Sequence, residues 1–164
     1  MRTWSTAAIL ILAWMLTTLA GCRREAALQL RTDADPLVHR LKLPSRIGAV
    51  RWLAVSPNKD TGWIPPKIEF YNVYAYIELD DDAWVALSKT IGEPGGRDTF
   101  SLPRSVADVL IPASTMKSVK QSGSDAQIDG TSLHASALSS DPQKTEVQQA
   151  IRLDRVLIVR FVAR

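Results

Sequence analysis

The amino terminus constrains this chain more than any other part of it. A largely apolar run extends from Trp4 to Ala20, and its 17 residues are at the short end of what spans a bilayer, roughly 17 to 25. Arg2 supplies a positive start, Ile9 to Leu16 an apolar centre, and Ala20-Gly21 the small residues that precede a cleavage site. The pattern is typical of a secretion signal, with an uncleaved anchor helix as the alternative.

The run closes at Leu19-Ala20-Gly21-Cys22, which matches a lipobox at all four positions, so the first 22 residues resemble bacterial prolipoproteins. The resemblance implies that residues 1–21 are a cleaved signal peptide and that Cys22 is acylated on its thiol and its new amino group. Several chains such as palmitate together give stable anchoring, which a single chain does not. Arg23 stands where the rule for inner-membrane retention calls for aspartate, which implies the outer membrane and a domain facing the periplasm.

Removal of residues 1–21 leaves 143 residues, enough for one domain with its own core. We expect residues 22–45 to be the lipidated cysteine and a flexible tether, because prolines interrupt scattered apolar residues, and residues 46–164 to be one globular domain. A short strand or helix within Leu37 to Leu43 is the alternative for that part of the tether. Loss of Arg2 lowers the net charge from +3 to +2, which offers no basic face for nucleic acid. With Cys22 as the only cysteine, an internal disulfide is excluded.

The mature chain predicts an α+β fold with a mainly antiparallel sheet of about four to six strands and two or three short helices packed on one face. Alternating or aromatic and β-branched residues predict strands over 47–55, 68–79 and 153–163, the last near the sheet centre. Apolar spacing predicts helices over 82–91, ending before Gly92, and over 142–151. We expect a loop over 56–67, a helical turn at most within 100–111, and one or two edge strands within 113–140.

Residues that carry chemistry are sparse. His39 and His134 lie 95 positions apart, so a zinc site is not expected, and no phosphate-binding glycine loop occurs. Ser132 and Ser136 flank His134 in a polar segment, but adjacency in sequence does not make a catalytic triad. We therefore expect no metal, no cofactor and no enzymatic activity.

The acidic run after the second strand has two interpretations. Glu78, Asp80 and Asp82 alternate and could converge on calcium, yet the run leads directly into the apolar start of the 82–91 helix. An aspartate there caps free amides, and further carboxylates in the first turn oppose the helix dipole. We favour the helix start over a metal site.

A macromolecular partner is the function we expect for this domain, because a small anchored domain without recognisable reactive groups suits binding better than turnover. The partner would be a protein or cell-wall component of the envelope, or a toxin or enzyme that the domain inhibits as an immunity factor. The alternatives are a cell-wall hydrolase that uses Glu69, Glu78 or Asp80, and a structural assembly factor. The candidate contact residues are Trp63, Lys67, Tyr71, Asp80, Asp81 and Asp82.

Overall fold

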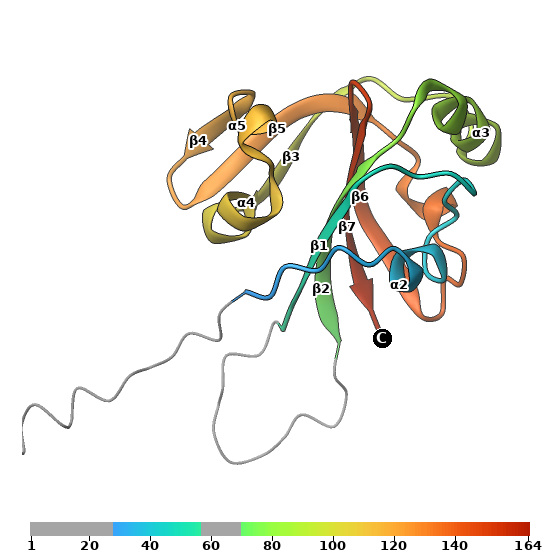
Figure 1. Ribbon diagram of the computed structural model, residues 1–164, viewed down its shortest axis with the longest axis horizontal. Coiled ribbons are helices and arrows are strands. Elements are labelled where there is room, and N and C mark those ends of the chain that lie inside the picture. Colours follow the sequence, from blue (N-terminus) through green and yellow to red (C-terminus); the bar gives the residue numbers. More distant parts are fainter. Residues whose placement is uncertain (1–27, 57–69) are drawn as a thin grey trace, which may run out of the picture.

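The computed structural model describes residues 28–56 and 70–164 (Figure 1). These residues form a seven-stranded antiparallel sheet in the order β1-β2-β7-β6-β5-β3, with β4 paired to β5. The strands are β1 (Val50–Val55), β2 (Tyr71–Glu78), β3 (Arg97–Pro103), β4 (Val119–Ser122), β5 (Asp125–Ser132), β6 (Thr145–Leu153) and β7 (Val156–Ala163). The helices are α2 (Asp35–Val38), α3 (Asp81–Ile91), α4 (Arg104–Leu110), α5 (Ala113–Met116) and the 3-10 helix η1 (Ala135–Leu138). The α+β class with a mainly antiparallel sheet is confirmed.

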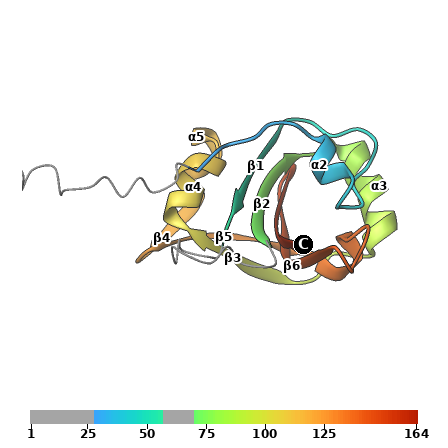
Figure 2. The same cartoon turned by 90° about the horizontal axis from the view of Figure 1, so that it is seen from below.

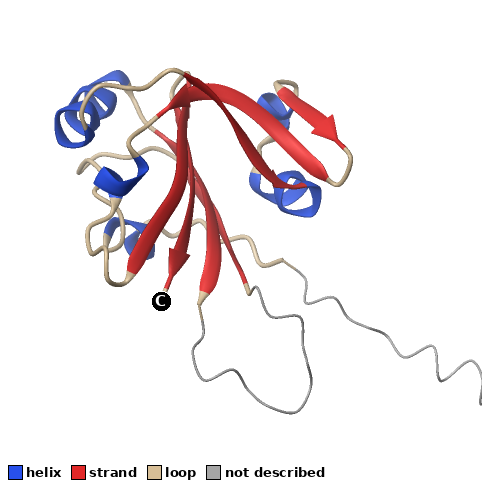
Figure 3. Cartoon of the chain, turned by 180° about the vertical axis from the view of Figure 1, so that it is seen from behind, coloured by secondary structure: helices blue, strands red, loops and turns tan. Residues whose placement is uncertain are grey.

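The sheet is curled, and apolar residues pack on both of its faces. Figures 1 and 2 show β3, β4 and β5 bending away from the other strands, with α4 and α5 inside the bend. We call this the inner face; its core joins Leu53 of β1 to Phe100 of β3 and Leu110 of α4. The outer face packs against α2, α3 and η1 through residues such as Trp84 and Leu138. Helices therefore cover both faces, as Figure 3 shows, and the expected one-sided arrangement is wrong for α4 and α5.

The centre of the sheet agrees with the sequence pattern. The strand predicted over 153–163 is β7, which lies between β2 and β6, and the strand predicted over 68–79 is β2, which lies between β1 and β7. Apolar residues on both sides of these strands reflect the two cores. The predicted helix over 82–91 is α3, and Gly92 ends it with φ 85°.

The helix predicted over 142–151 is wrong, because this segment is β6. Its register against β7 shifts between Val147 and Gln149, which marks a bulge. The extra residue lets Val147 and Ala150 both pack into the outer-face core although three positions separate them. A spacing of three positions is also that of an apolar stripe on a helix, which explains the wrong prediction. Ile151, the third residue of the predicted stripe, packs on the inner face instead.

Between Gly92 and β6 the chain is more regular than the sequence indicates. A helical turn at most was expected within 100–111, but Phe100 and Leu102 alternate along β3, and α4 follows directly at Arg104. The one or two strands expected within 113–140 are β4 and β5. β4 is a short edge strand, while β5 is longer and pairs with β3, β4 and β6.

Residues 28–49, which we call the strap, pass along the β1 edge of the sheet and then over its outer face instead of forming a free tether. The backbone of Arg31 pairs with that of Trp52 through two hydrogen bonds of 2.9 Å. Leu37 and Leu41 are each 1% exposed and belong to the outer-face core. The flexible tether expected over 22–45 is therefore wrong for residues 28–45. The alternative of a short helix near Leu37 is met in part by α2, but the burial of Leu37 and Leu41 against the sheet was not predicted.

Candidate functional site

The first candidate surface is the corner where β2 passes into α3. Asp80 is the N-cap of α3, and its Oδ1 accepts a hydrogen bond of 2.7 Å from the backbone N–H of Ala83. Asp81 pairs with Arg155 at 2.7 Å, with both side chains exposed, and Asp82 is an exposed member of the first turn. The helix-start interpretation of this run is confirmed. Within the described residues no group of three or more His, Cys, Asp or Glu could hold a metal ion.

The remaining predicted contact residues do not join this corner. Tyr71 begins β2 and Asp80 follows its end, so the strand between them separates the two by more than about 20 Å at about 3.3 Å per residue. Cys22, Trp63, Lys67 and Glu69 lie outside the described residues. No single site can therefore be assembled from Tyr71 and the acidic corner.

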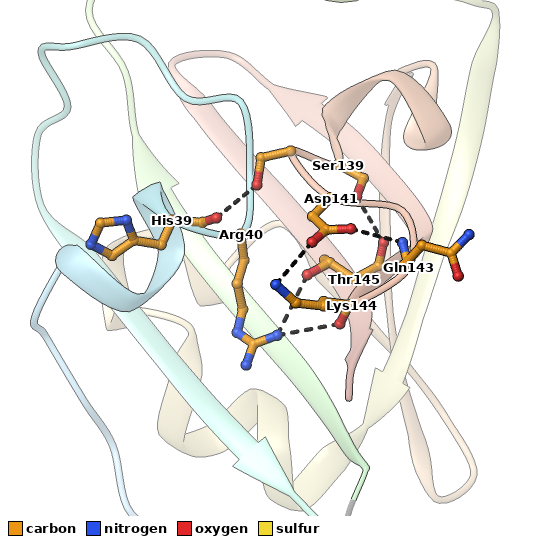
Figure 4. A network of polar contacts seen from close by, with 8 residues as sticks. His39, Arg40, Ser139, Asp141, Gln143, Lys144 and Thr145 are labelled. Carbon is orange, nitrogen blue, oxygen red and sulfur yellow. Dashed lines mark hydrogen bonds and ion pairs between the residues drawn. The ribbon is translucent and has the colours of Figure 1, made fainter.

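A second polar cluster fastens the strap to the loop before β6 (Figure 4). Arg40 Nη1 donates to the backbone oxygen of Lys144 at 3.3 Å and to Thr145 Oγ1 at 3.5 Å. Ser139 Oγ donates to the backbone oxygen of Thr145 at 2.7 Å, and Ser140 Oγ donates to that of His39, also at 2.7 Å. The bonds of Arg40 and of Ser140 join segments more than 90 residues apart in sequence, whereas the Ser139 bond lies within the loop before β6. The cluster fixes the path of the chain and is structural.

Two carboxylates in the described residues have displaced pKa values, and both are displaced downward. The side chain of Lys144 and then the backbone N–H of Gln143 lower the pKa of Asp141 from its ordinary 3.8. Lys120 and then Thr99 lower the pKa of Asp129 in the same way, through hydrogen bonds of 2.6 and 2.8 Å. A carboxyl that serves as a general acid needs the opposite shift. Neither aspartate is tuned for that role.

The third candidate surface is the inner face, where two Tyr–Arg pairs lie side by side. Tyr76 and Arg51 are opposite each other in the β1–β2 register, so their side chains share a face. Arg51 Nη2 donates to the backbone oxygen of Val109 at 2.6 Å, in the last turn of α4, where carbonyls lack helical partners. The hydroxyl of Tyr76 lies 3.0 Å from Thr115 Oγ1 of α5. Helices α4 and α5 therefore supply the partners of this first pair.

The second pair, Tyr74 and Arg160, is opposite in the β2–β7 register and lies on the same face. Arg160 Nε is buried without a hydrogen-bond partner, and within the described residues the Arg160 guanidinium forms neither an ion pair nor a hydrogen bond. The Tyr74 hydroxyl likewise has no hydrogen bond to the described residues. Nε of Arg51 is buried without a partner as well, so this atom does not distinguish the two pairs. The Nη nitrogens of Arg160 and the hydroxyl of Tyr74 are not among the buried atoms without a partner, so they reach solvent. The second pair thus differs from Arg51 and Tyr76 in having solvent-accessible polar atoms that no described residue binds.

Among the described residues, the acids that the strand register and the Gln149 side chain connect to this face already have other partners. Glu146 is opposite Val162, one pair along the strand, and it accepts a hydrogen bond of 3.1 Å from Arg164. Gln149, directly opposite Arg160, donates to Asp98 at 3.3 Å and to the backbone oxygen of Thr99 at 3.0 Å. None of the contact residues predicted from sequence lies at this Tyr–Arg pair. The available signal was an arginine inside the most apolar strand of the chain.

Comparison of the chain with protein-family models, with curated proteins and with solved structures found no match. Within the described residues no helix has the length and apolar character needed to cross a membrane. The function is therefore inferred from this chain's own residues.

Proposed function

We propose that this chain is a lipid-anchored protein of the bacterial envelope whose folded domain binds another protein. The observation that carries the proposal is the lipobox Leu19-Ala20-Gly21-Cys22 at the end of an apolar segment. Acylation of Cys22 would hold the domain at a membrane surface, with the outer membrane favoured by Arg23. A partner that inhabits the envelope, or one that enters it such as a toxin, would meet the domain there.

The strap supports a short distance between anchor and domain. Arg31 is joined to β1 by two backbone hydrogen bonds and follows Cys22 by nine residues. Nine residues span at most about 32 Å even when fully extended. The domain would therefore remain close to the lipid surface, which suits the capture of a partner at the membrane.

The inner face supports binding as the activity. Tyr and Arg are enriched at protein interfaces and dominate their energetic centres, because both combine a large contact area with directed hydrogen bonds. Tyr74 is only 7% exposed and lies beside Arg160, Asn72, Gln149 and Val162, which are half-buried. These side chains give a surface of mixed polar and apolar character, typical of a contact between proteins.

Metabolic labelling with a palmitate analogue tests the anchor. The wild-type chain should incorporate label and sediment with membranes, whereas Cys22→Ser should lose the label. Arg24→Ala, which leaves the lipobox intact, is the matched control and should label normally. Equal labelling of Cys22→Ser and wild type would contradict the proposal.

Crosslinking in intact cells followed by purification under denaturing conditions tests the binding function. The anchored wild-type chain should yield a discrete protein adduct, and Cys22→Ser should yield less of it. Failure to recover any adduct while the anchored chain itself is recovered would contradict a protein-binding role.

A further inference from the structure

We infer that Arg160 and Tyr74 form the contact site for an acidic side chain of a partner protein, with Arg160 engaging the carboxylate. This inference rests on the proposed function and deepens it by naming the surface and the chemistry of the partner. Its basis is the contrast between two neighbouring Tyr–Arg pairs on one sheet face, of which only one has partners within the described chain.

The first pair shows what such a site requires. In both pairs the arginine Nε is buried without a partner, so the two guanidinium groups are alike in that respect. Arg51 differs because its Nη2 reaches a helix carbonyl at 2.6 Å, and Tyr76 differs because its hydroxyl lies 3.0 Å from Thr115 Oγ1. An oxygen acceptor for the guanidinium and a hydrogen-bond partner for the phenol are therefore what Arg160 and Tyr74 lack.

A carboxylate meets both requirements and matches the charge. It is a stronger acceptor for a guanidinium than a carbonyl is, and its second oxygen can accept from a phenol. Because Nε of Arg160 is buried, the carboxylate would approach the two Nη nitrogens end-on. Glu146 is held by Arg164, and Asp98 accepts from Gln149, so both carboxylates already have partners.

The surroundings favour a protein side chain as the source of the carboxylate. Arg160 is half-buried in the sheet, and Val162 and Asn72 continue the same face toward the ends of β7 and β2. A ligand that carries apolar surface beside its carboxylate would bind more tightly here, because it would also cover the half-buried apolar area next to Arg160. An acidic residue within a folded surface or peptide supplies both.

The test uses the full chain, purified from whichever cell fraction holds it, with isotope labelling to follow the Nε and Cζ signals of Arg160. The probes are a capped peptide that contains glutamate and the same peptide with glutamine in its place. The glutamate peptide should shift the Arg160 signals and leave those of Arg51 unchanged. Arg160→Gln should weaken glutamate-peptide binding roughly tenfold or more.

Three further variants keep the result interpretable. Arg160→Met fills a similar volume without charge and stands in for Arg160→Gln if that variant does not fold. Arg160→Lys keeps the charge but loses the planar fork, so it should bind with intermediate affinity. Arg51→Gln is the matched control: it should lower stability, because Val109 loses its donor, and leave peptide binding by the folded protein unchanged.

Equal binding of the two peptides would overturn the inference, as would wild-type affinity in folded Arg160→Gln or Arg160→Met. Acetate that shifts the Arg160 signals as strongly as the glutamate peptide would overturn the assignment to a protein side chain. These outcomes are separate from failure of the proposed function, because labelling at Cys22 and recovery of an adduct are measured without reference to Arg160.

Discussion

Asp80 stabilises α3 by accepting one hydrogen bond from the Ala83 amide. Alanine at this position would have no side-chain acceptor for that amide. We predict that Asp80→Ala lowers the free energy of unfolding by about 1 kcal/mol, within the 0.5–2 range typical of N-caps. Asp82→Ala is the control, because Asp82 is exposed in the first turn and is not the cap. Urea denaturation measures both, and an equal loss in the two variants would contradict the capping role.

Asp141 makes a second prediction at the residue scale, on pH. Its pKa in the folded chain lies below the ordinary 3.8, chiefly because Lys144 bonds to the carboxylate. The stabilisation is therefore present above pH 3.8 and is lost as the pH falls through the lower, folded value. Asp141→Asn should be less stable than the wild type at neutral pH, and the difference should shrink in acid. Denaturation curves at several pH values check this, and a difference that grows in acid would contradict it.

The strap is held on the sheet by two buried leucines, Leu37 and Leu41. Leu37 is 1% exposed, so Leu37→Ala should destabilise the protein by about 2–5 kcal/mol through lost burial and a residual cavity. Val38, the next residue of α2, is 45% exposed, and Val38→Ala should change stability by less than about 0.5 kcal/mol. Thermal denaturation compares the two variants. Similar stability of both would show that the strap does not belong to the folded domain.

Gly130 of β5 lies where the backbone of β5 passes close to that of β6. A Cβ added there would lie 2.7 Å from the backbone oxygen of Arg152, whereas one added at Gly96 meets nothing within 4 Å. Gly130→Ala should therefore cost about 1–3 kcal/mol through displacement of β5 from β6, and Gly96→Ala should be nearly neutral. Chemical denaturation compares the two variants. Equal stabilities would contradict a close approach of β6 to Gly130.

A helix or strand can be predicted from the sequence when the apolar or capping pattern that forms it lies within its own residues. β1, β2, β7 and α3 were predicted because alternation, apolar runs and the Asp80 cap are visible along the chain. β6 was misassigned because its bulge places Val147 and Ala150 on one face at helical spacing. The strap was missed because the burial of Leu37 depends on a sheet that is distant in sequence.

At the scale of the whole molecule, the sequence alone suggests the proposed anchor, whereas the proposed inner-face site can be found only from the fold. A lipobox is a contiguous motif, whereas the pairing of Arg160 with Tyr74 is created by the β2–β7 register. Of the contact residues predicted from sequence, Trp63 and Lys67 lie outside the described residues, and the fold places Tyr71 and the acidic corner at opposite ends of β2. We propose a membrane-anchored domain that offers the Arg160–Tyr74 pair to a partner protein.

Site-specific photocrosslinking in intact cells tests whether a partner protein contacts the domain at Arg160. A photoreactive residue at Val162, beside Arg160 on the inner face, is compared with one at Val85, which is 57% exposed on α3 over the other face. If the partner binds at Arg160, position 162 should give a protein adduct that Arg160→Gln removes, and position 85 should give none. An adduct at position 162 that persists in Arg160→Gln, or adducts at position 85 alone, would contradict it.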